Sequence, residues 1–338
     1  MSYNIGMYGG SFNPLHMGHL SCIIRAANMC KELYVVLCVA THRQEIDYRI
    51  RYRWIYQLTR HIGNVKIILL QDPSASKEEY SREQEISDSD YIKKTIGKPI
   101  DIVFCGSDYD ENSFWNRCYP ESKLHIFPRD GISSTEIRRD PYAHWDWLPQ
   151  IVRPYFVKKV LLVGGESTGK STLTINLANY YNTNYIDEAG REISERSGTD
   201  LLMLGSDFTE ILLQHKLNEI KAMEHSNKVL FVDTDSLITQ FYMHFLEDPQ
   251  KEKNIALSDA IDRLNSYDLI LFLEPDVAFV QDGDRSPVIE QDREIYSHQI
   301  KEILKAHGRA FLSVSGSYDI RFLKATAAVN KLFIQEEA

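Results

Sequence analysis

One stretch of eight residues, 164–171, constrains the fold of this chain more than any other. It reads Gly-Gly-Glu-Ser-Thr-Gly-Lys-Ser and stands between an apolar run, 160–163, and a helical pattern that begins with Thr172. A strand, a glycine-rich loop and a helix in this order direct backbone N–H groups and a helix N-terminus at one point, where a phosphate group can bind. The sequence therefore predicts a P-loop carried by a parallel α/β sheet.

The predicted loop gives roles to its own side chains. The Lys170 ammonium would neutralise the β and γ phosphate oxygens of ATP, and the Ser171 hydroxyl would hold Mg²⁺. The other candidate contacts to the nucleotide are Gly164, Gly165, Glu166, Ser167, Thr168, Gly169 and Thr172.

The position of the loop predicts two domains. The strand before a P-loop normally comes first in its domain, but here it follows a segment far too long to be a tail, and 338 residues exceed the usual size of a single core. We expect the domains to span 1–155 and 156–338. The join, 140–156, is rich in proline, tryptophan and tyrosine, which favours a packed junction over a flexible linker.

Composition limits the partners and the compartment of the chain. The formal net charge is −10, and such a surface disfavours general binding to nucleic acids or anionic membranes. The longest apolar runs have the length of strands, and residues 1–9 lack the apolar core of a signal peptide. We therefore expect a cytoplasmic protein that acts on small molecules. The five cysteines form no C-x-x-C pair, which predicts free thiols.

Apolar runs alternate with helical patterns through the first half of the chain. The runs are 5–8, 33–39, 65–70, 102–105 and 124–127, and the helical patterns are 18–30, 49–61, 82–96 and 112–118. This alternation predicts a doubly wound parallel sheet of the Rossmann-like kind, with ligands at the C-terminal ends of its strands.

A motif of glycines and histidines follows the first of these runs. It consists of Gly9, Gly10, Ser11, Phe12 and Asn13, then His16 and His19. The glycines let the backbone approach a ligand, and both imidazoles can donate hydrogen bonds to one polyphosphate with help from the helix dipole.

A second cluster of polar residues comprises Ser133, Ser134, Thr135 and Arg138. A serine here can simply cap a helix. The hydroxyl groups, the free N–H groups of a helix start and the arginine can equally form an anion site. The sequence alone leaves both interpretations open.

Two further segments carry weaker signals. Gly106, Asp108 and Trp115 follow the fourth run, where a polar turn is the alternative to a nucleotide site. Arg53 lies in a segment, 43–54, that mixes arginines with aromatic residues. This mixture suits an aromatic ring and a phosphate group, but it also suits a half-exposed helix.

The second half repeats the alternation, with apolar runs at 160–163, 185–186, 229–232, 269–273 and 310–314. Asp233 follows the third run and is placed to reach Mg²⁺, unless it only caps a helix or turn. The acidic stretch 187–192 follows the second run, where small kinases hold the phosphate acceptor. The segment 281–285 ends in Arg285. It predicts either a lid that carries this arginine or a plain turn.

The two motifs of the first half resemble those of the nucleotidyltransferase superfamily, which transfers adenylyl or cytidylyl groups. Over residues 5–293, the order of motifs resembles the bifunctional nicotinamide-mononucleotide adenylyltransferase / ribosylnicotinamide kinase family of the NadR type. The most specific parts are G-G-S-F-N-P-x-H-x-G-H paired with S-S-T-x-I-R, the P-loop written G-G-E-S-x-G-K-S-T, and the D-T-D that ends run 229–232.

This resemblance implies two reactions that both use ATP. The kinase domain would phosphorylate ribosylnicotinamide to its mononucleotide (NMN), and the other domain would join NMN to AMP, giving NAD and pyrophosphate. By the same resemblance, the adenylyl donor contacts His16, His19, Ser133, Ser134, Thr135 and Arg138, and the nucleotides contact Gly106, Asp108 and Trp115. In the kinase domain the implied residues are Lys170, Ser171 and Asp233 for ATP and Mg²⁺, Asp187, Arg191 and Asp235 for ribosylnicotinamide, and Arg285 for the lid.

One departure from the family concerns regulation. Some members begin with a helix-turn-helix DNA-binding domain, whereas residues 4–10 here already belong to the first predicted strand, so we expect no such domain.

Two rival functions remain. One is a phosphopantetheine adenylyltransferase fused to a dephospho-coenzyme A kinase, and the acidic stretch 187–192 argues against it. The other is a regulator that senses nucleotides without turnover. Against it stand the intact charged and imidazole residues His16, His19, Lys170 and Asp233. The sequence does not say whether the chain forms a homo-oligomer.

Overall fold

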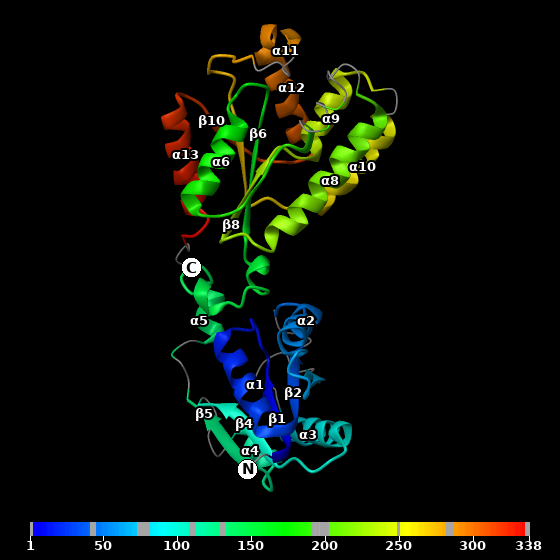
Figure 1. Ribbon diagram of the computed structural model, residues 1–338, viewed down its shortest axis with the longest axis vertical. Helices are drawn as coiled ribbons and strands as arrows, with labels where there is room; N and C mark the ends of the chain where they lie inside the picture. Colours follow the sequence, from blue (N-terminus) through cyan, green and yellow to red (C-terminus); the bar gives the residue numbers. More distant parts are fainter. Residues whose placement is uncertain are drawn as a thin grey trace. The chain divides into compact units, whose positions relative to one another are not determined.

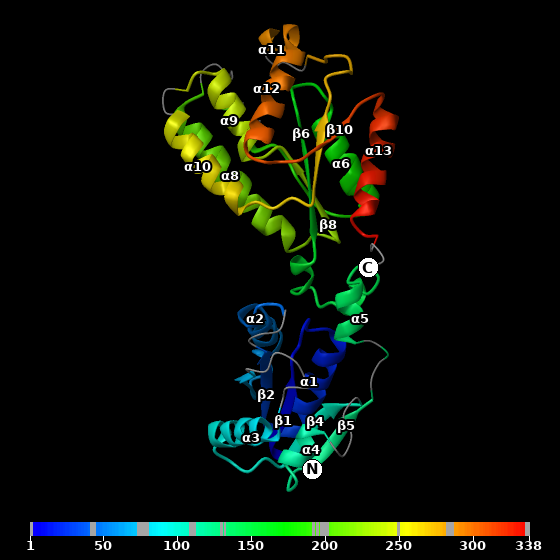
Figure 2. The same cartoon turned by 180° about the vertical axis from the view of Figure 1, so that it is seen from behind.

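Ten parallel strands in the described part of the chain form two separate sheets of five (Figures 1 and 2). In this computed structural model the sheets belong to two units, Met1–Val152 and Arg153–Ala338. The structure describes residues 3–40, 45–72, 81–107, 113–128, 131, 133–190, 193, 196, 203–248, 251–281 and 287–334. The predicted fold class, two doubly wound parallel sheets, is confirmed, whereas the boundary after residue 155 stays a prediction.

The first unit follows the predicted order of strands and helices. Its strands are β1 (Tyr3–Gly10), β2 (Cys30–Ala40), β3 (Val65–Asp72), β4 (Ile102–Gly106) and β5 (Lys123–Phe127). Its helices are α1 (Met17–Met29), α2 (Tyr48–Thr59), α3 (Arg82–Ile96), α4 (Phe114–Cys118) and α5 (Ser134–Arg139). The sheet order is β3-β2-β1-β4-β5. The chain therefore winds outward from β1 and then returns to β4, which places the ends of β1 and β4 at the switch point where ligands bind in such folds.

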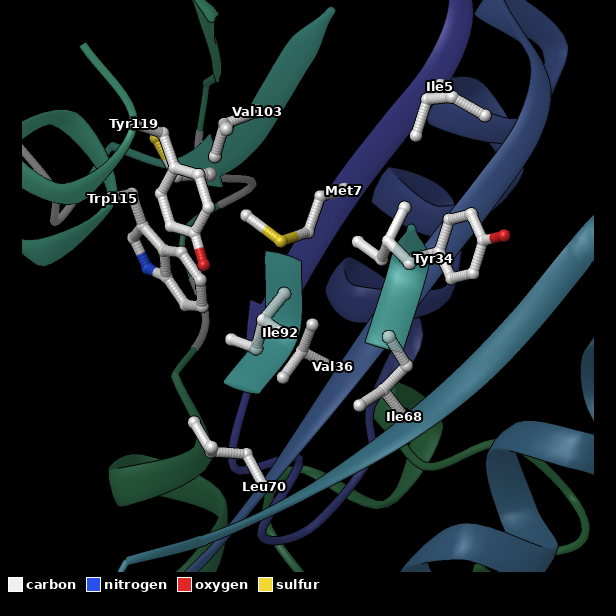
Figure 3. Packing of buried hydrophobic residues seen from close by; sticks show 12 residues of the cluster. Ile5, Met7, Tyr34, Val36, Ile68, Leu70, Ile92, Val103, Trp115 and Tyr119 are labelled. Carbon is white, nitrogen blue, oxygen red and sulfur yellow. The ribbon is translucent and has the colours of Figure 1, made fainter. Parts of the chain in front are cut away.

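Alternate residues of the strands build the core of this unit. Ile5 and Met7 of β1 are both buried and share one hydrophobic cluster with Ile92 of α3 and Trp115 of α4. Because strand side chains alternate between faces, these residues mark the face of the sheet that α3 and α4 cover. Figure 3 shows the Met7 side chain directed toward Trp115 and Tyr119.

The second unit has the P-loop strand at its centre. Its strands are β6 (Lys158–Gly164), β7 (Tyr185–Ile186), β8 (Val229–Asp233), β9 (Leu269–Leu273) and β10 (Leu312–Val314). Its helices are α6 (Lys170–Tyr181), α8 (Gly205–Met223), α9 (Ser236–Phe245), α10 (Lys251–Leu264), α11 (Pro287–Gln291), α12 (Arg293–Ala306) and α13 (Tyr318–Lys331). The sheet order is β10-β9-β6-β8-β7.

Helices cover both faces of this second sheet. Helices α6 and α13 lie on one side, and α8, α9 and α10 lie on the other (Figures 1 and 2). Val160 and Leu162 of β6 pack in one cluster with Leu177 of α6 and Val329 of α13. None of the helices that the structure describes combines the length and the apolar character needed to cross a lipid bilayer.

Candidate functional sites

The loop after β1 brings two histidines together. Phe12 has a left-handed backbone with φ of 49°, and His16 is the N-cap residue of α1. The His16 and His19 rings stack, with centroids 3.8 Å apart and planes 30° apart, and the edge-on Phe12 ring lies 5.0 Å from His19. Because the first N–H groups of a helix lack intrahelical partners, this pair of imidazoles stands where an anion is favoured.

Helix α5 is tied to this loop. The Arg138 guanidinium donates hydrogen bonds to the Asn13 carbonyl oxygen and to Thr135 Oγ1, the latter at 3.0 Å. Ser134 Oγ donates to the Pro14 carbonyl oxygen at 3.2 Å. The structure therefore brings together the two motifs that lie at opposite ends of the first unit's sequence.

Ser133 serves as the N-cap of α5. Its Oγ accepts a hydrogen bond from the Glu136 N–H at 3.1 Å, and the Glu136 carboxylate accepts one from the Ser133 N–H at 2.8 Å. This reciprocal pair is a capping box, and the loss of a serine cap typically costs about 0.5–2 kcal/mol of stability. The structural interpretation of Ser133 is thus correct, and its contact with a phosphate group stays a prediction.

Arg51, rather than Arg53, reaches the loop from α2. Arg53 is exposed, whereas Arg51 is 1% exposed and its Nη1 donates to the Ser11 carbonyl oxygen at 2.6 Å. Arg51 Nη2 also lies 3.0 Å from Glu45 Oε2. The buried Ile55 stands four residues after Arg51, so the helical phase of the buried face was a signal that could have identified it. A substrate contact of Arg53 stays a prediction.

Trp115 packs in the core of the first unit. It is 4% exposed, and its ring lies so close to Gly9 that a Cβ there would overlap the indole. Gly9 is therefore required by the close approach of a side chain. Gly106 ends β4 next to this site, and Asp108 lies outside the described residues. Direct contacts of these residues with a nucleotide stay predictions.

The P-loop follows β6, the central strand of the second sheet. Gly164 has φ of +150°, and a Cβ there would lie 2.6 Å from the Leu273 carbonyl oxygen of β9, so only glycine fits. Lys170 Nζ and Thr168 Oγ1 both donate hydrogen bonds to the Gly165 carbonyl oxygen, at 3.0 and 2.9 Å. The loop thus holds its lysine against its own backbone, at the N-terminus of α6.

Two arginines far away in the sequence hold the P-loop from outside. Arg321 of α13 donates to the Thr168 carbonyl oxygen at 2.6 Å, and Arg293 of α12 donates to the Ser167 carbonyl oxygen at 3.2 Å. Arg321 is 1% exposed. The sequence did not single it out, because no motif distinguishes it from an arginine in solvent.

Asp233 ends β8 beside the P-loop, where it pairs in register with Leu162 of β6. It is 1% exposed, and neither carboxylate oxygen accepts a hydrogen bond of normal geometry from a described residue. The pKa of Asp233 is raised to about 6, mainly by burial and also by the charge of Glu188, while Lys170 and Ser171 act in the opposite direction.

These oxygen atoms suit Mg²⁺. Magnesium prefers oxygen ligands and is usually held by one or two carboxylates, water and the phosphates of a substrate. Asp233 supplies a buried carboxylate that has no hydrogen bond of normal geometry to a described residue, and Ser171, which also lowers its pKa, supplies a hydroxyl in the first turn of α6. The two residues predicted as metal ligands therefore fit the ion.

A cavity of about 220 Å³ lies beside the P-loop. The P-loop forms one wall, and the others come from the turn after β7, from one face of α8 and from one face of α9. The lining side chains outside the P-loop include Glu188, Met203, Phe208, Ile211, His215, Asp235, Ile238, Thr239, Tyr242 and Leu246. The cavity thus joins a phosphate-binding wall to an apolar one with a few polar groups, which is the usual composition of a small-molecule site.

Asp235 is one of the predicted substrate residues, and it lines this cavity. Its carboxylate also caps α9 by accepting a hydrogen bond from the Leu237 N–H at 3.1 Å. Burial raises the pKa of Asp235 to about 7, and the nearby Asp262 carboxylate acts in the same direction.

Of the three remaining substrate and lid residues predicted for this unit, the structure describes only Asp187. Asp187 is exposed and does not line the cavity, whereas the next residue, Glu188, does. Arg191 and Arg285 lie outside the described residues. Substrate contacts of Asp187, Arg191, Asp235 and Arg285 stay predictions.

Each unit thus carries a phosphate-binding loop after the first strand of a parallel sheet, which defines a protein with two nucleotide-binding α/β domains. Family models agree with this division. Residues 7–140 match a family described as Cytidylyltransferase-like, and residues 159–321 match one described as AAA domain.

Similar proteins extend over the whole chain. The chain is 30% identical to the trifunctional NAD biosynthesis/regulator protein NadR of Escherichia coli (strain K12), over 97% of this chain and 83% of that protein. Its fold is shared by two solved structures that each cover 100% of this chain and of which it covers 98%. They are NadR protein in complex with NR (TM-score 0.82, 20% identity) and NadR protein in complex with NAD and AMP-PNP (TM-score 0.80, 21% identity). The chain belongs to the NadR family, so the family predicted from the motifs is confirmed.

Another relative matches only part of the chain. Phosphopantetheine adenylyltransferase of Streptococcus pneumoniae (strain CGSP14) is 37% identical over 73 residues, which are 21% of this chain and 45% of that protein. This match is confined to a fraction of the chain, whereas the match to NadR extends over nearly all of it.

Proposed function

We propose that the chain is a bifunctional transferase of NAD salvage. It phosphorylates ribosylnicotinamide with ATP to give NMN, and it adenylylates NMN with a second ATP to give NAD and pyrophosphate. The observation that carries this proposal is that each unit has its own loop at the start of a helix, with His16 and His19 in one and Lys170 in the other, and such loops suit phosphate groups. Membership of a family whose relatives are named for NAD biosynthesis supports the choice of substrates.

In the second unit, the 5′-hydroxyl of ribosylnicotinamide attacks the γ-phosphorus of ATP. Lys170 and the backbone N–H groups of the P-loop neutralise the phosphate oxygens, and catalysis rests on positioning and electrostatic stabilisation. Mg²⁺, held by Ser171 and Asp233, would supply further neutralisation of the phosphate charge. The cavity beside the loop receives the riboside, with Asp235 on its wall.

Three further residues are proposed for the kinase site. Asp187 and Arg191 follow β7 and are proposed to contact the riboside. Arg285 is proposed as a lid cation that closes over the transferring phosphoryl group.

In the first unit, a phosphate oxygen of NMN attacks the α-phosphorus of ATP, and pyrophosphate leaves. His16 and His19 donate hydrogen bonds to the phosphate oxygens and stabilise the charge that builds up there. Arg138, with the hydroxyl groups of α5, holds the β and γ phosphates from the other side of the loop. No nucleophile from the protein is needed.

One experiment separates the two activities. Formation of NAD from ribosylnicotinamide and ATP is measured for the unmodified chain and for Lys170→Ala and His19→Ala, and each measurement is repeated with NMN. Lys170→Ala should abolish use of the riboside and spare use of NMN. His19→Ala should block both routes to NAD and let NMN accumulate from the riboside. Each variant is thus the matched control for the other.

Other acceptors test the rival functions. Phosphopantetheine and dephospho-coenzyme A should accept neither an adenylyl nor a phosphoryl group. If they react and the nicotinamide compounds do not, the enzyme belongs to coenzyme A synthesis. If the chain binds ATP and turns over none of these compounds, it is a sensor and the proposal is wrong.

We further propose that the enzyme works in the cytoplasm on small molecules alone, without a nucleic-acid partner. The net charge of −10 supports this, because a negative surface repels nucleic acid.

A further inference from the structure

The P-loop carries a carboxylate that the function proposed above does not use. Glu166 is the third residue of the loop, is half-buried, and lines the cavity beside it. A carboxylate repels the phosphate oxygens that such a loop binds, so its presence there is unfavourable for ATP alone. Because the same cavity receives the phosphate acceptor, the acceptor is the ligand that can benefit from this group.

A tyrosine fixes the position of this carboxylate. The Tyr242 hydroxyl donates a hydrogen bond to Glu166 Oε1 at 3.4 Å. Tyr242 belongs to α9, lines the cavity and packs against the hydrophobic cluster that contains Phe208 and Ile211, which line the same cavity. The Glu166–Tyr242 pair therefore connects the phosphate-binding wall of the cavity to its apolar wall.

The charged groups of the cavity are mostly acidic. Glu166, Glu188 and Asp235 all line it. Among the described residues of the lining, Lys170 is the only lysine or arginine, and it is assigned to the phosphates. Away from the phosphates, the described lining thus combines carboxyl groups with aromatic rings. This combination attracts a cation and gives nothing comparable to a neutral group.

The proposed acceptor carries a suitable charge. The ring nitrogen of ribosylnicotinamide has four bonds, one of them to the ribose, so the pyridinium ring is positive at every pH. If the 5′-hydroxyl faces the P-loop, this ring extends into the cavity that Glu166 and Tyr242 line. The face of a tyrosine ring attracts a cation, and a phenol that donates to a carboxylate is polarised in the direction that strengthens this attraction.

We propose that Glu166 and Tyr242 are specificity-determining residues of the kinase site, which bind the permanent positive charge of the acceptor's ring. The cavity then selects nucleosides with a cationic base over nucleosides of the same shape with a neutral base. This inference rests on the proposed kinase function and names the property of the acceptor that the site recognises.

Two substitutions separate the charge from the hydrogen bond. Glu166→Gln removes the negative charge and keeps an oxygen that can accept the Tyr242 hydroxyl. Tyr242→Phe removes the hydroxyl and keeps both the ring and the carboxylate. Glu224→Gln, at an exposed position that ends α8 and does not line the cavity, removes one negative charge elsewhere and is the matched control. Thermal unfolding verifies that each variant is folded.

The assay compares two acceptors that differ in charge. Ribosylnicotinamide has the cationic ring, and its 1,4-dihydro form has a neutral ring with the same amide and ribose. Phosphorylation of each by ATP is followed at mildly alkaline pH, where the reduced ring is stable, with kcat and KM determined separately.

The expected preference follows from Coulomb's law. Opposite unit charges about 6 Å apart, at an effective dielectric constant of about 20, attract each other enough for a roughly 100-fold gain in binding. Glu166 is half-buried, so solvent screens part of this attraction, and the unmodified chain should favour the cationic acceptor by about 10-fold in kcat/KM.

The variants should differ in this preference. Glu166→Gln should lose most of it through a higher KM for ribosylnicotinamide, and its KM for ATP should not rise, because a negative charge beside the phosphates has been removed. Tyr242→Phe should keep part of the preference, and Glu224→Gln should keep all of it. In the unmodified chain, added KCl should reduce the preference, since salt screens the attraction.

Three results are decisive against these ideas. If Glu166→Gln lowers kcat/KM for both acceptors by one factor, the pair only braces the P-loop against α9 and the inference is wrong. If the unmodified chain phosphorylates both acceptors equally well, the inference is wrong without recourse to any variant, and the kinase function stands. If the unmodified chain phosphorylates neither, the proposed kinase function itself is wrong.

Discussion

Replacement of Gly9 by alanine tests how the phosphate loop of the first unit is held. A Cβ at Gly9 would overlap Cη2 and Cζ2 of the Trp115 indole and would lie 3.1 Å from its Cζ3. Carbon atoms in favourable contact are about 3.5–4.0 Å apart. Trp115 is 4% exposed and packs in the core cluster shown in Figure 3, so its ring cannot move aside without displacing other core residues.

The magnitude follows from this overlap. Overpacking a filled core typically costs about 1–3 kcal/mol, and a methyl group that overlaps a rigid ring belongs at the upper end, about 3 kcal/mol. For a unit of this size, each kcal/mol lowers the midpoint of thermal unfolding by about 2–4 °C. Gly9→Ala should therefore lower the unfolding midpoint of the first unit by about 6–12 °C.

The assay combines calorimetry of the full chain with both activities. Adenylylation of NMN should fall because the His16 loop continues directly from β1. Phosphorylation of ribosylnicotinamide should remain, because its residues belong to the other unit. The stability control is Gly106→Ala at the end of the neighbouring β4, where a Cβ would meet nothing within 4 Å. Adding Trp115→Phe to Gly9→Ala removes part of the overlap and should restore part of the lost stability.

The reasoning has a clear point of failure. If Gly9→Ala unfolds at the same temperature as Gly106→Ala, the packing of Trp115 against the strand does not hold the loop. If the double variant is no more stable than Gly9→Ala alone, the loss arises from something other than the indole ring.

Three more predictions concern other parts of the chain. Gly164→Ala should abolish phosphorylation of the riboside and destabilise the second unit, because its Cβ would lie 2.6 Å from a carbonyl oxygen of β9; Gly165→Ala, with nothing within 4 Å, should leave thermal stability unchanged. Arg51→Leu should destabilise the first unit by about 3–5 kcal/mol in denaturant unfolding, since it leaves a carboxylate partner unpaired, whereas the exposed Arg53→Leu should change stability by less than about 0.5 kcal/mol. Burial raises the pKa of Asp233 to about 6, so its carboxylate takes up a proton below that pH. The kcat/KM of riboside phosphorylation should therefore fall between pH 7 and pH 5, and more Mg²⁺ should shift the fall to lower pH. A profile that stays flat over this range would count against Asp233 as a metal ligand.

Local patterns in the sequence were enough to predict the strands of both units, the helices of the first unit and the P-loop. The apolar runs 185–186 and 269–273 coincide with β7 and β9, and the helical pattern 82–96 coincides with α3. Helix α3 begins where the Ser81 side chain accepts a hydrogen bond from the Gln84 N–H, and it ends at the left-handed Gly97. Such signals act between residues a few positions apart, so they can be recognised without knowledge of the fold.

Which of several similar residues is buried near a site depends on the tertiary structure alone. Arg51 and Arg53 stand on one helix, but only Arg51 is buried against the Ser11 carbonyl oxygen. Arg321 supports the P-loop through Thr168, a residue 153 positions away, and His215 gains its place in the cavity only when α8 packs beside β8. Burial and hydrogen-bond partners depend on which faces of the helices and sheets meet, and this is set by packing across the whole unit and not by neighbours in the chain.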